Sequence, residues 1–200
     1  MDLKLIHLGK GAPTTDYLSM YRLRYQTYCV ESQFLDPALY PNDFEYDAYD
    51  SISEHFILKF KNTVIGTVRL IHWNSKLPFP TSLHCKELIK ELEEHDFPLN
   101  DTVEISRLCI SKRCRKYPIH ILELFKGLYC ISKEQNITHW IGSFEETLQR
   151  LLHQYGVYFV PLIPYEIEYY GKVHIYGASL ERLEKDMIKI RPDLVNFFTN

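Results

Sequence analysis

The most strand-like stretch of the chain is HFILKFKNTVIGTVRLIH, residues 55–72. Its two runs, 55–61 and 63–72, are rich in β-branched and apolar residues, which favour strands. The runs flank Lys61-Asn62, so the stretch predicts an antiparallel hairpin. We therefore expect this hairpin to lie in the sheet on which the rest of the fold is built.

A third strand is predicted at VEISRLCI, residues 103–110. Strict alternation along a strand places Glu104 and Ser106 on one face and Arg107 on the other. The polar face, with Glu104 and Ser106, is expected to look into a cleft.

The remaining elements follow from apolar spacing, capping residues and breakers. We expect strands at 2–8, 139–142, 157–162 and 166–176, and helices at 14–32, 117–134, 144–155 and 180–190, with an ordered loop at 33–50. Thr14 and Thr15 are expected to cap the first of these helices, and Gly156 to end the third. No internal repeat or linker divides the sequence. The simplest assembly is a single α/β (α+β) domain over 1–200, a mixed sheet with helices on both faces.

Composition narrows the classes of partner. A net charge of −3 and a pI near 6.3 give no basic footprint for nucleic acid. No stretch approaches the roughly 18 apolar residues of a membrane span, so no integral membrane segment is expected. The five cysteines are odd in number and never form C-x-x-C, which suggests neither a disulfide framework nor a zinc knuckle and fits a reducing cytoplasm.

The strongest local signal is the acidic cluster EYDAYD at 45–50, which places Glu45, Asp47 and Asp50 within six residues. Crowded carboxylates repel one another unless a cation lies between them, so the cluster suits binding and deprotonating an amine. A solvated acidic loop or a set of calcium ligands is the alternative, although the spacing and the glycine of an EF-hand are missing. Arginines that could hold the carboxylates lie elsewhere in the chain, at Arg22, Arg24, Arg69 and Arg107.

A second signal is the basic run SKRCRK at 111–116, which follows a predicted strand and precedes a predicted helix. Its four cations are Lys112, Arg113, Arg115 and Lys116. Cations and a helix N-terminus both attract phosphate, and a solvated basic turn is the alternative. No Gly-rich phosphate loop is present.

Other catalytic classes have little support. The sequence contains no G-x-S-x-G nucleophile elbow, no H-E-x-x-H metal-binding helix and no Rossmann G-x-G-x-x-G. The nine histidines are dispersed, so neither a bound metal nor a permanently bound cofactor is expected.

Four motifs together carry a resemblance: RLRYQTY at 22–28, EYDAYD at 45–50, GTVRL at 66–70 and VEISRL at 103–108. In order and spacing they resemble acyl-homoserine-lactone synthases and long-chain N-acyl amino acid synthases. The likeness is greater to acyltransferases associated with PEP-CTERM/exosortase systems, through the run YRLRYQTYCVESQFLDP and the tail at 165–176. It spans nearly the whole chain.

The resemblance implies a GNAT-type fold, with a mixed, splayed sheet that admits an acyl-pantetheine arm. It also implies charged residues that shape the amine site and brace the acidic loop, at Arg24, Glu45, Asp47, Asp50, Arg69, Glu104 and Arg107, with Ser106 in the same strand. The usual pyrophosphate loop R-x-x-G-x-G/A is absent. The basic run therefore favours acyl carrier protein over coenzyme A as the source of the acyl-phosphopantetheine thioester.

The expected reaction is direct attack of a neutral amine, from an amino acid or similar small molecule, on the acyl thioester. Glu45 is the first choice of base, directly or through water, and Glu104 is the reserve. Two alternatives stay open: a lactone-forming synthase that uses S-adenosylmethionine, and a non-catalytic module that binds acyl carrier protein. The tryptophan usual in lactone synthases before the acidic loop is missing, with Phe34 nearby. The sequence leaves acyl length, acceptor identity and oligomeric state open.

Overall fold

A computed structural model describes residues 2–9 and 11–199. The chain forms two compact units. The N-terminal unit holds the residues up to Leu70 together with Ser106–Leu128, and the C-terminal unit holds Ile71–Ile105 and the residues from Tyr129 on.

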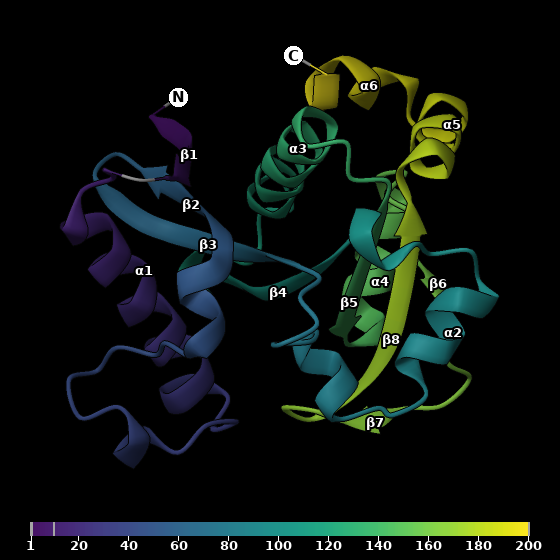
Figure 1. The fold of residues 1–200 in the computed structure, drawn as a ribbon. Helices are drawn as coiled ribbons and strands as arrows, with labels where there is room; N and C mark the ends of the chain where they lie inside the picture. The colour runs from purple at the N-terminus through teal and green to yellow at the C-terminus, as the bar shows by residue number, and fades with distance from the viewer. Residues whose placement is uncertain (1, 10, 200) are drawn as a thin grey trace. The chain divides into compact units, whose positions relative to one another are not determined.

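The N-terminal unit contains the strand order β1-β2-β3-β4 (Figure 1). Strand β1 (Leu3–Leu8) pairs antiparallel with β2 (Ser53–Phe60), in a register that runs from Leu3 opposite Phe60 to Leu8 opposite His55. Strands β3 (Thr63–His72) and β4 (Thr102–Ile110) follow in that order. The strands expected at 2–8, 55–61, 63–72 and 103–110 are confirmed.

Two helices cover opposite faces of this sheet, because alternate strand residues point to opposite sides. On one face, Met20 of α1 (Thr14–Tyr25) packs with Leu8 and Ile57. On the other face lies α3 (Ile119–Glu134), which approaches so closely that a Cβ at Gly127 would come within 2.9 Å of Leu5 and Phe56. A residue larger than glycine at this position would force those side chains to move.

The first helix differs from the expectation at both ends. Pro13 is the N-cap of α1 and no side chain caps the helix, so Thr14 is its first residue and neither threonine caps it. The α-helix ends at Tyr25 and continues to Glu31 as a π-helix, Gln26–Glu31. Short π-helical segments occur often at functional sites, and this one precedes the acidic loop.

The C-terminal unit contains the strand order β4-β5-β8-β6, with β7 paired to β8. Strand β5 (His139–Phe144) runs parallel to β4, with Thr102 opposite His139. The other pairings are antiparallel: β8 (Lys172–Ser179) pairs with β5, with β6 (Val160–Pro161) and with β7 (Ile167–Glu168). With antiparallel and parallel neighbours and helices around it, the sheet has the mixed, open character expected from the sequence.

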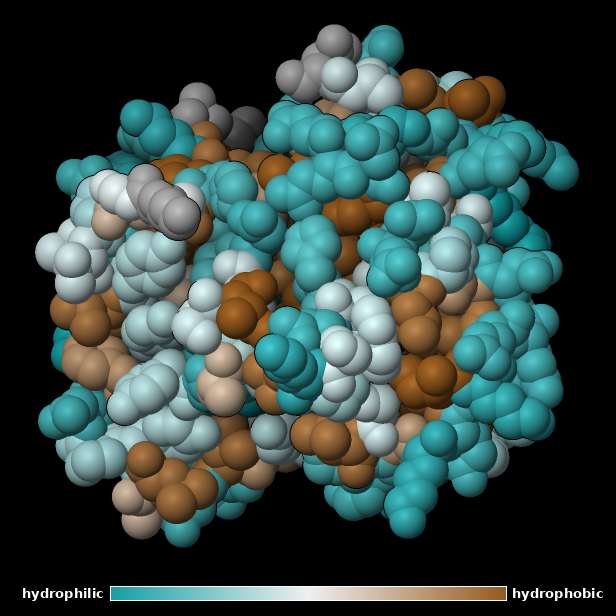
Figure 2. Space-filling view, in the orientation of Figure 1, coloured by the Kyte–Doolittle hydropathy of each residue, from teal (hydrophilic) through white to brown (hydrophobic). Residues whose placement is uncertain are grey.

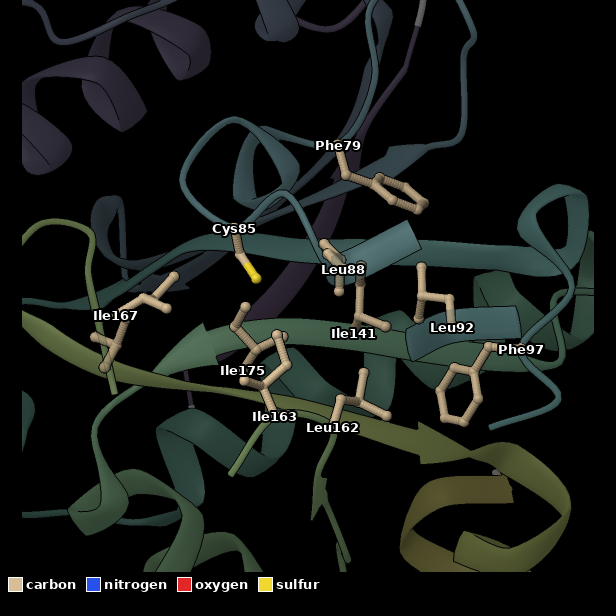
Figure 3. Packing of buried hydrophobic residues seen from close by; sticks show 11 residues of the cluster. Phe79, Cys85, Leu88, Leu92, Phe97, Ile141, Leu162, Ile163, Ile167 and Ile175 are labelled. Atoms are coloured by element: carbon tan, nitrogen blue, oxygen red, sulfur yellow. The ribbon is translucent and has the colours of Figure 1, made fainter. Parts of the chain in front are cut away.

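The core of the C-terminal unit lies between α2 (Leu88–Glu94) and the sheet. Figure 3 shows Leu88 and Leu92 of α2 facing Ile141 of β5 and Ile175 of β8. Phe79 is fully buried in the same cluster. The unit also contains α4 (Glu146–Gln154), α5 (Leu180–Ile190) and α6 (Pro192–Thr199).

The C-terminal unit differs from the expectation in four places. The strand expected at 157–162 is reduced to the two residues of β6, Val160–Pro161. The strand expected at 166–176 is broken into β7 and β8, because Tyr170 and Gly171 both take positive φ angles and turn the chain. Helices α2 and α6 were not expected from the sequence. The predicted helix end at Gly156 is confirmed, since this glycine has φ +77° and its N–H donates to the carbonyl of His153.

Short 3-10 segments connect these elements, at Pro37–Leu39, Ala48–Ile52, Pro80–Leu83, Leu99–Asp101 and Lys112–Cys114. The face drawn in Figure 2 is mainly hydrophilic, with hydrophobic residues dispersed over it. Within residues 2–9 and 11–199, no helix combines the length and the apolar character that crossing a bilayer requires.

Candidate functional site

Hydrogen bonds within the acidic loop hold its backbone in a tight turn. The Asp47 side chain accepts a hydrogen bond from the Tyr49 N–H at 2.9 Å, and the Asp50 side chain accepts one from the Asp47 N–H at 2.7 Å. This reciprocal pattern is a capping box around the turn Ala48–Ile52. The backbone N–H of Glu45 donates to the Tyr21 carbonyl of α1 at 3.1 Å. The loop therefore presents three carboxylates in fixed positions.

Arg24, in the last turn of α1, joins two of these carboxylates. Its Nε donates to Glu45 at 2.5 Å, and its two terminal nitrogens donate to Asp50 at 2.6 and 3.1 Å. The Arg24 side chain is fully buried. A guanidinium suits this position because its planar fork binds a carboxylate through two parallel hydrogen bonds.

Arg69 of β3 joins Asp50 to Asp47. One terminal nitrogen donates to Asp47 at 2.5 Å and to Asp50 at 3.0 Å, and the other donates to Asp47 at 3.1 Å. Its Nε donates to the Ser106 hydroxyl of β4 at 2.9 Å. All three nitrogens of this guanidinium are therefore used within the site.

Arg107 of β4 closes a ring. Its Nε donates to Glu45 at 3.1 Å, and a terminal nitrogen donates to Asp47 at 3.0 Å. Three arginines and three carboxylates then alternate in a closed circuit, in the order Arg24, Asp50, Arg69, Asp47, Arg107 and Glu45. Their formal charges cancel, and we call this set the ionic ring.

The ring shifts the pKa values of Arg24, Asp47 and Asp50 toward their charged forms. Burial, the largest single influence on Asp50, favours the neutral acid, but Arg24 and Arg69 outweigh it and hold the pKa of Asp50 well below its usual range. The same opposition lowers the pKa of Asp47, through Arg69 and Arg107. Burial alone would lower the pKa of Arg24, but Glu45 and Asp50 together raise it. Arg24, Asp47 and Asp50 are therefore charged at neutral pH.

One expectation about β4 is wrong. Strict alternation puts Ser106 and Arg107 on opposite faces, yet Ser106 contacts Arg69 while Arg107 contacts the carboxylates that Arg69 binds. Arg107 has φ 51°, a left-handed conformation that is unusual for a non-glycine residue inside a strand. Such a residue breaks the alternation of a strand, and strained residues of this kind cluster at functional sites.

The ring changes the expected role of Glu45. The side chain is fully buried, and its two oxygens accept hydrogen bonds from Arg24 and Arg107. Both oxygens are thus occupied by guanidinium donors and shielded from solvent, a geometry that disfavours Glu45 as a general base. The alternative interpretation as calcium ligands also loses support, because the cluster's carboxylates already have cationic partners. Among the described residues, no group of three or more His, Cys, Asp or Glu is arranged to hold a metal ion.

The reserve base lies in the C-terminal unit. Glu104 of β4 is 1% exposed, and its two oxygens accept from the Thr81 hydroxyl at 2.9 Å and the Thr81 N–H at 3.2 Å. The Thr81 hydroxyl lies 2.8 Å from the Ser143 hydroxyl of β5. No sequence motif singled out Thr81 or Ser143.

The basic run is not uniform. Lys112, Arg113, Arg115 and Lys116 are all exposed. Arg115 is engaged within the chain, because its Nε donates to the Ile110 carbonyl at 2.8 Å and a terminal nitrogen pairs with Glu31 at 2.5 Å. The helix expected directly after the run begins only at Ile119.

A cavity of about 740 Å³ adjoins the acidic loop within the N-terminal unit. Asp47 and Asp50 line it together with Tyr17, Tyr21 and Tyr46. The Asp47 side chain is 25% exposed, against 5% or less for the other ring members. Sequence reasoning did not single out these tyrosines, although Tyr17 and Tyr21 stand four residues apart on α1 and so share a face.

The comparisons with known proteins agree with this fold. The family model for the acetyltransferase (GNAT) domain matches residues 23–123, about half of the chain's 200 residues. No curated protein matches the chain in sequence.

Several solved structures share the fold across nearly the whole chain. They include the AHL synthase LasI, at a TM-score of 0.69 and 15% identity over 95% of this chain and 94% of that chain. FeeM, an N-acyl amino acid synthase from uncultured soil microbes, has a TM-score of 0.65 and 14% identity over 98% and 99%. BjaI, a CoA-dependent acyl-homoserine lactone synthase with SAM and isopentyl-CoA, has a TM-score of 0.71 and 17% identity over 98% and 87%.

Proposed function

We propose that this chain is an N-acyl amino acid synthase-like enzyme. It belongs to the acetyltransferase (GNAT) domain family and is an acyltransferase. It would move a long-chain fatty acyl group from an acyl carrier protein thioester to the amine of an amino acid or similar small molecule. We propose that the whole chain acts as one catalytic domain and that it does so in the cytoplasm. On the basis of the sequence resemblance, we also propose that the enzyme is associated with a PEP-CTERM/exosortase system.

The observation that carries the proposal is the ionic ring. Each of the four motifs that resemble N-acyl amino acid synthases contributes to it: 22–28 supplies Arg24, 45–50 the three carboxylates, 66–70 Arg69, and 103–108 Arg107 with its neighbour Ser106. Motifs far apart in the sequence thus meet in one buried set of contacts.

We assign the ring to the acceptor side of the reaction. Arg24, Asp50, Arg69, Ser106 and Arg107 would hold the acidic loop in place. Asp47 would be the ring carboxylate open to a cationic group, because it is the ring member with the most exposed side chain and it lines the tyrosine-walled cavity. A carboxylate beside aromatic rings suits an ammonium group, through charge and cation–π attraction.

Proton removal is assigned to Glu104 in preference to Glu45. An amine is mostly protonated at neutral pH and becomes a nucleophile only after it loses a proton. Glu104 accepts from the hydroxyl and the N–H of Thr81, whereas Glu45 is already bound by two arginines.

The thiols of Cys29, Cys85 and Cys109 are protonated at neutral pH, since burial raises each pKa, that of Cys109 to about 12. Direct attack of the amine on the thioester is therefore favoured over a thiol-bound intermediate.

The donor is assigned to acyl carrier protein on the basis of Lys112, Arg113 and Lys116. Their exposed cations suit the acidic surface and the phosphopantetheine of a carrier protein. Arg115 supports this segment from within, through Glu31 and Ile110. Acyl-coenzyme A is the competing donor.

Mass spectrometry of lipids from a host that overproduces the protein tests the proposal. We expect N-acyl amino acids in the host with the wild-type protein, and their loss in a host with Glu104→Gln at equal protein level. Accumulation of acyl-homoserine lactones would assign the chain to the alternative synthase class. A lipid profile identical to that of the empty host, together with retained binding of acyl carrier protein, would identify a binding module instead.

A further inference from the structure

We propose that Ser143 and Thr81 form a hydroxyl relay that delivers the proton of the acceptor amine to Glu104. The inference rests on the proposed function and extends it, because it names the path by which a buried carboxylate acts as the base.

The geometry fixes the direction of the relay. The Thr81 hydroxyl donates to a Glu104 oxygen at 2.9 Å. A hydroxyl carries a single proton and can accept at its lone pairs at the same time. Because the Thr81 proton points to Glu104, the contact of 2.8 Å between the two hydroxyls is one in which Ser143 donates to Thr81. The three groups therefore form a chain of donors that runs from Ser143 to Glu104.

Burial explains why a relay is needed. Thr81 and Glu104 are each 1% exposed. Ser143 is only partly buried, so it is the one of the three residues that is accessible from solvent. A proton that enters at Ser143 reaches the carboxylate without the acceptor having to penetrate to Glu104.

The three groups sit on rigid elements, as a relay requires. Thr81 lies in the turn Pro80–Leu83, where its carbonyl accepts from the Cys85 N–H at 3.0 Å. Its own N–H donates to the second oxygen of Glu104 at 3.2 Å. Ser143 lies in β5 opposite Ile175 of β8. Backbone hydrogen bonds of the turn therefore fix the position of Thr81, and the pairing of β5 with β8 fixes that of Ser143.

The step balances in protons. The amine nitrogen gives one proton to the Ser143 oxygen as Ser143 passes its own proton to Thr81, and Thr81 passes its own to Glu104. Each hydroxyl gains one proton and loses one, so the net change is a neutral amine and a protonated Glu104. When the amine attacks and the thioester C–S bond breaks, the nitrogen loses its second proton, and the departing thiolate takes it up to become the free thiol. Glu104 then releases the first proton to solvent through Thr81 and Ser143, which restores the carboxylate.

Turnover of four variants tests the relay with the full-length protein. Thr81→Val removes the central hydroxyl at similar volume and should lower kcat by about 100-fold, the lower end of general-base contributions, with little change in KM. Thr81→Ser restores the hydroxyl and should recover most of this loss. Ser143→Ala should lower kcat to a smaller extent, because water can replace an exposed hydroxyl. Ser82→Ala, which removes a neighbouring hydroxyl that donates to the Phe79 carbonyl, is the matched control and should be close to wild type.

The isotope composition of the solvent gives a second readout that a structural role would not change. Transfer of several protons in one step makes the rate depend nonlinearly on the deuterium fraction, and Thr81→Val should remove this curvature. If Thr81→Val turns over at the wild-type rate while Glu104→Gln does not, Glu104 remains the base and the relay is overturned.

A titration that needs no turnover separates the relay from the proposed function. Carboxyl 13C NMR reports the pKa of Glu104 in the folded protein. Loss of a donor to a carboxylate raises its pKa, so Thr81→Val should raise it clearly, Ser143→Ala slightly, and Ser82→Ala not at all. A pKa that Ser143→Ala leaves unchanged would overturn the relay. A wild-type protein that makes no N-acyl product but shows these shifts would overturn the function and retain the hydrogen-bond chain.

Discussion

Arg24 Nε lies 2.5 Å from a Glu45 oxygen, and neither side chain is exposed to solvent. This contact joins the end of α1 to the start of the acidic loop. A buried pair of this kind is weak evidence for stability as such, because desolvation offsets much of the attraction. Its value lies in the penalty for disrupting it, since either partner left alone would be a buried, uncompensated charge.

The first prediction is that Glu45→Gln destabilises the fold. The change keeps the volume but removes the charge that Arg24 and Arg107 share, and breaking a buried pair costs about 3–5 kcal/mol. Urea unfolding at pH 7 measures this loss. Glu146→Gln, which removes a surface pair with Arg150, is the control and should change stability little.

Activity of the same variant separates the two candidate bases. Under conditions in which Glu45→Gln is folded, we expect it to retain far more turnover than Glu104→Gln. A folded Glu45→Gln protein with wild-type stability and no turnover would return the role of base to Glu45.

The second prediction concerns acid. The pKa of Asp50 is held well below its usual range in the folded protein, and that of an unfolded aspartate is about 3.9. The stabilisation is therefore complete above about pH 4 and is lost as the pH falls toward the folded pKa. Asp50→Asn should be less stable than wild type at pH 7, and the gap in unfolding free energy should narrow by pH 3.

Asp193→Asn is the control for this titration. Asp193 pairs with Arg191 on the surface, where 59% of its side chain is exposed, so its removal should matter little at either pH. A gap between wild type and Asp50→Asn that stays constant from pH 7 to pH 3 would contradict the ionised ring.

The third prediction is that Arg69→Ala loosens the acidic loop and weakens catalysis together. The change leaves Asp47 and Asp50 without a shared guanidinium and Ser106 without its donor. Hydrogen exchange at the Asp47 and Tyr49 amides, which close the capping box, should become faster. Arg69→Lys should fall between the two, because it keeps the charge but loses the fork.

Arg150→Ala is the surface control for Arg69→Ala and should leave the amide exchange of the loop unchanged. An Arg69→Ala protein with normal protection of both amides and normal turnover would show that the ring has no part in holding the acceptor side.

The fourth prediction concerns the donor. Reversing charge at Lys112 and Arg113 should raise KM for an acyl carrier protein substrate about tenfold or more, and added salt should raise KM for the wild-type protein, because both weaken the electrostatic encounter. A short pantetheine thioester should be unaffected. Arg115 is left unchanged because it pairs with Glu31, so its reversal would mix binding with stability.

Reversal of Lys86 and Lys90, on and beside α2, provides a double variant of equal charge change. It should leave KM for the carrier near the wild-type value. Equal use of acyl-coenzyme A and acyl carrier protein, with neither donor affected at Lys112 and Arg113, would make the basic run a solvated surface.

The sequence predicts which residues form the ionic ring better than it predicts how they are arranged. Residue type and motif order identified Arg24, Asp47, Asp50, Arg69 and Arg107 as charged partners. Strand periodicity could not show that Arg107 takes a left-handed conformation, because this backbone angle depends on the contacts the side chain makes after folding.

The relay residues were beyond prediction for a related reason. Thr81 and Ser143 are 62 positions apart, and isolated hydroxyl residues carry no recognisable spacing. The fold shows the same limit. Long periodic runs such as β2 and β3 were predicted, whereas the seven-residue α2 and the break between β7 and β8 depend on short segments whose conformation is decided by packing.

Amide formation in a single turnover tests the central claim most directly. Purified protein would be mixed with a long-chain acyl carrier protein and a pool of amino acids, and the N-acyl product and released carrier thiol would be quantified together. The account predicts one N-acyl amide per carrier thiol for wild type, and a rate at least about 100-fold lower for Glu104→Gln. Release of thiol without any amide, or a Glu104→Gln protein that forms amide at the wild-type rate, would contradict it.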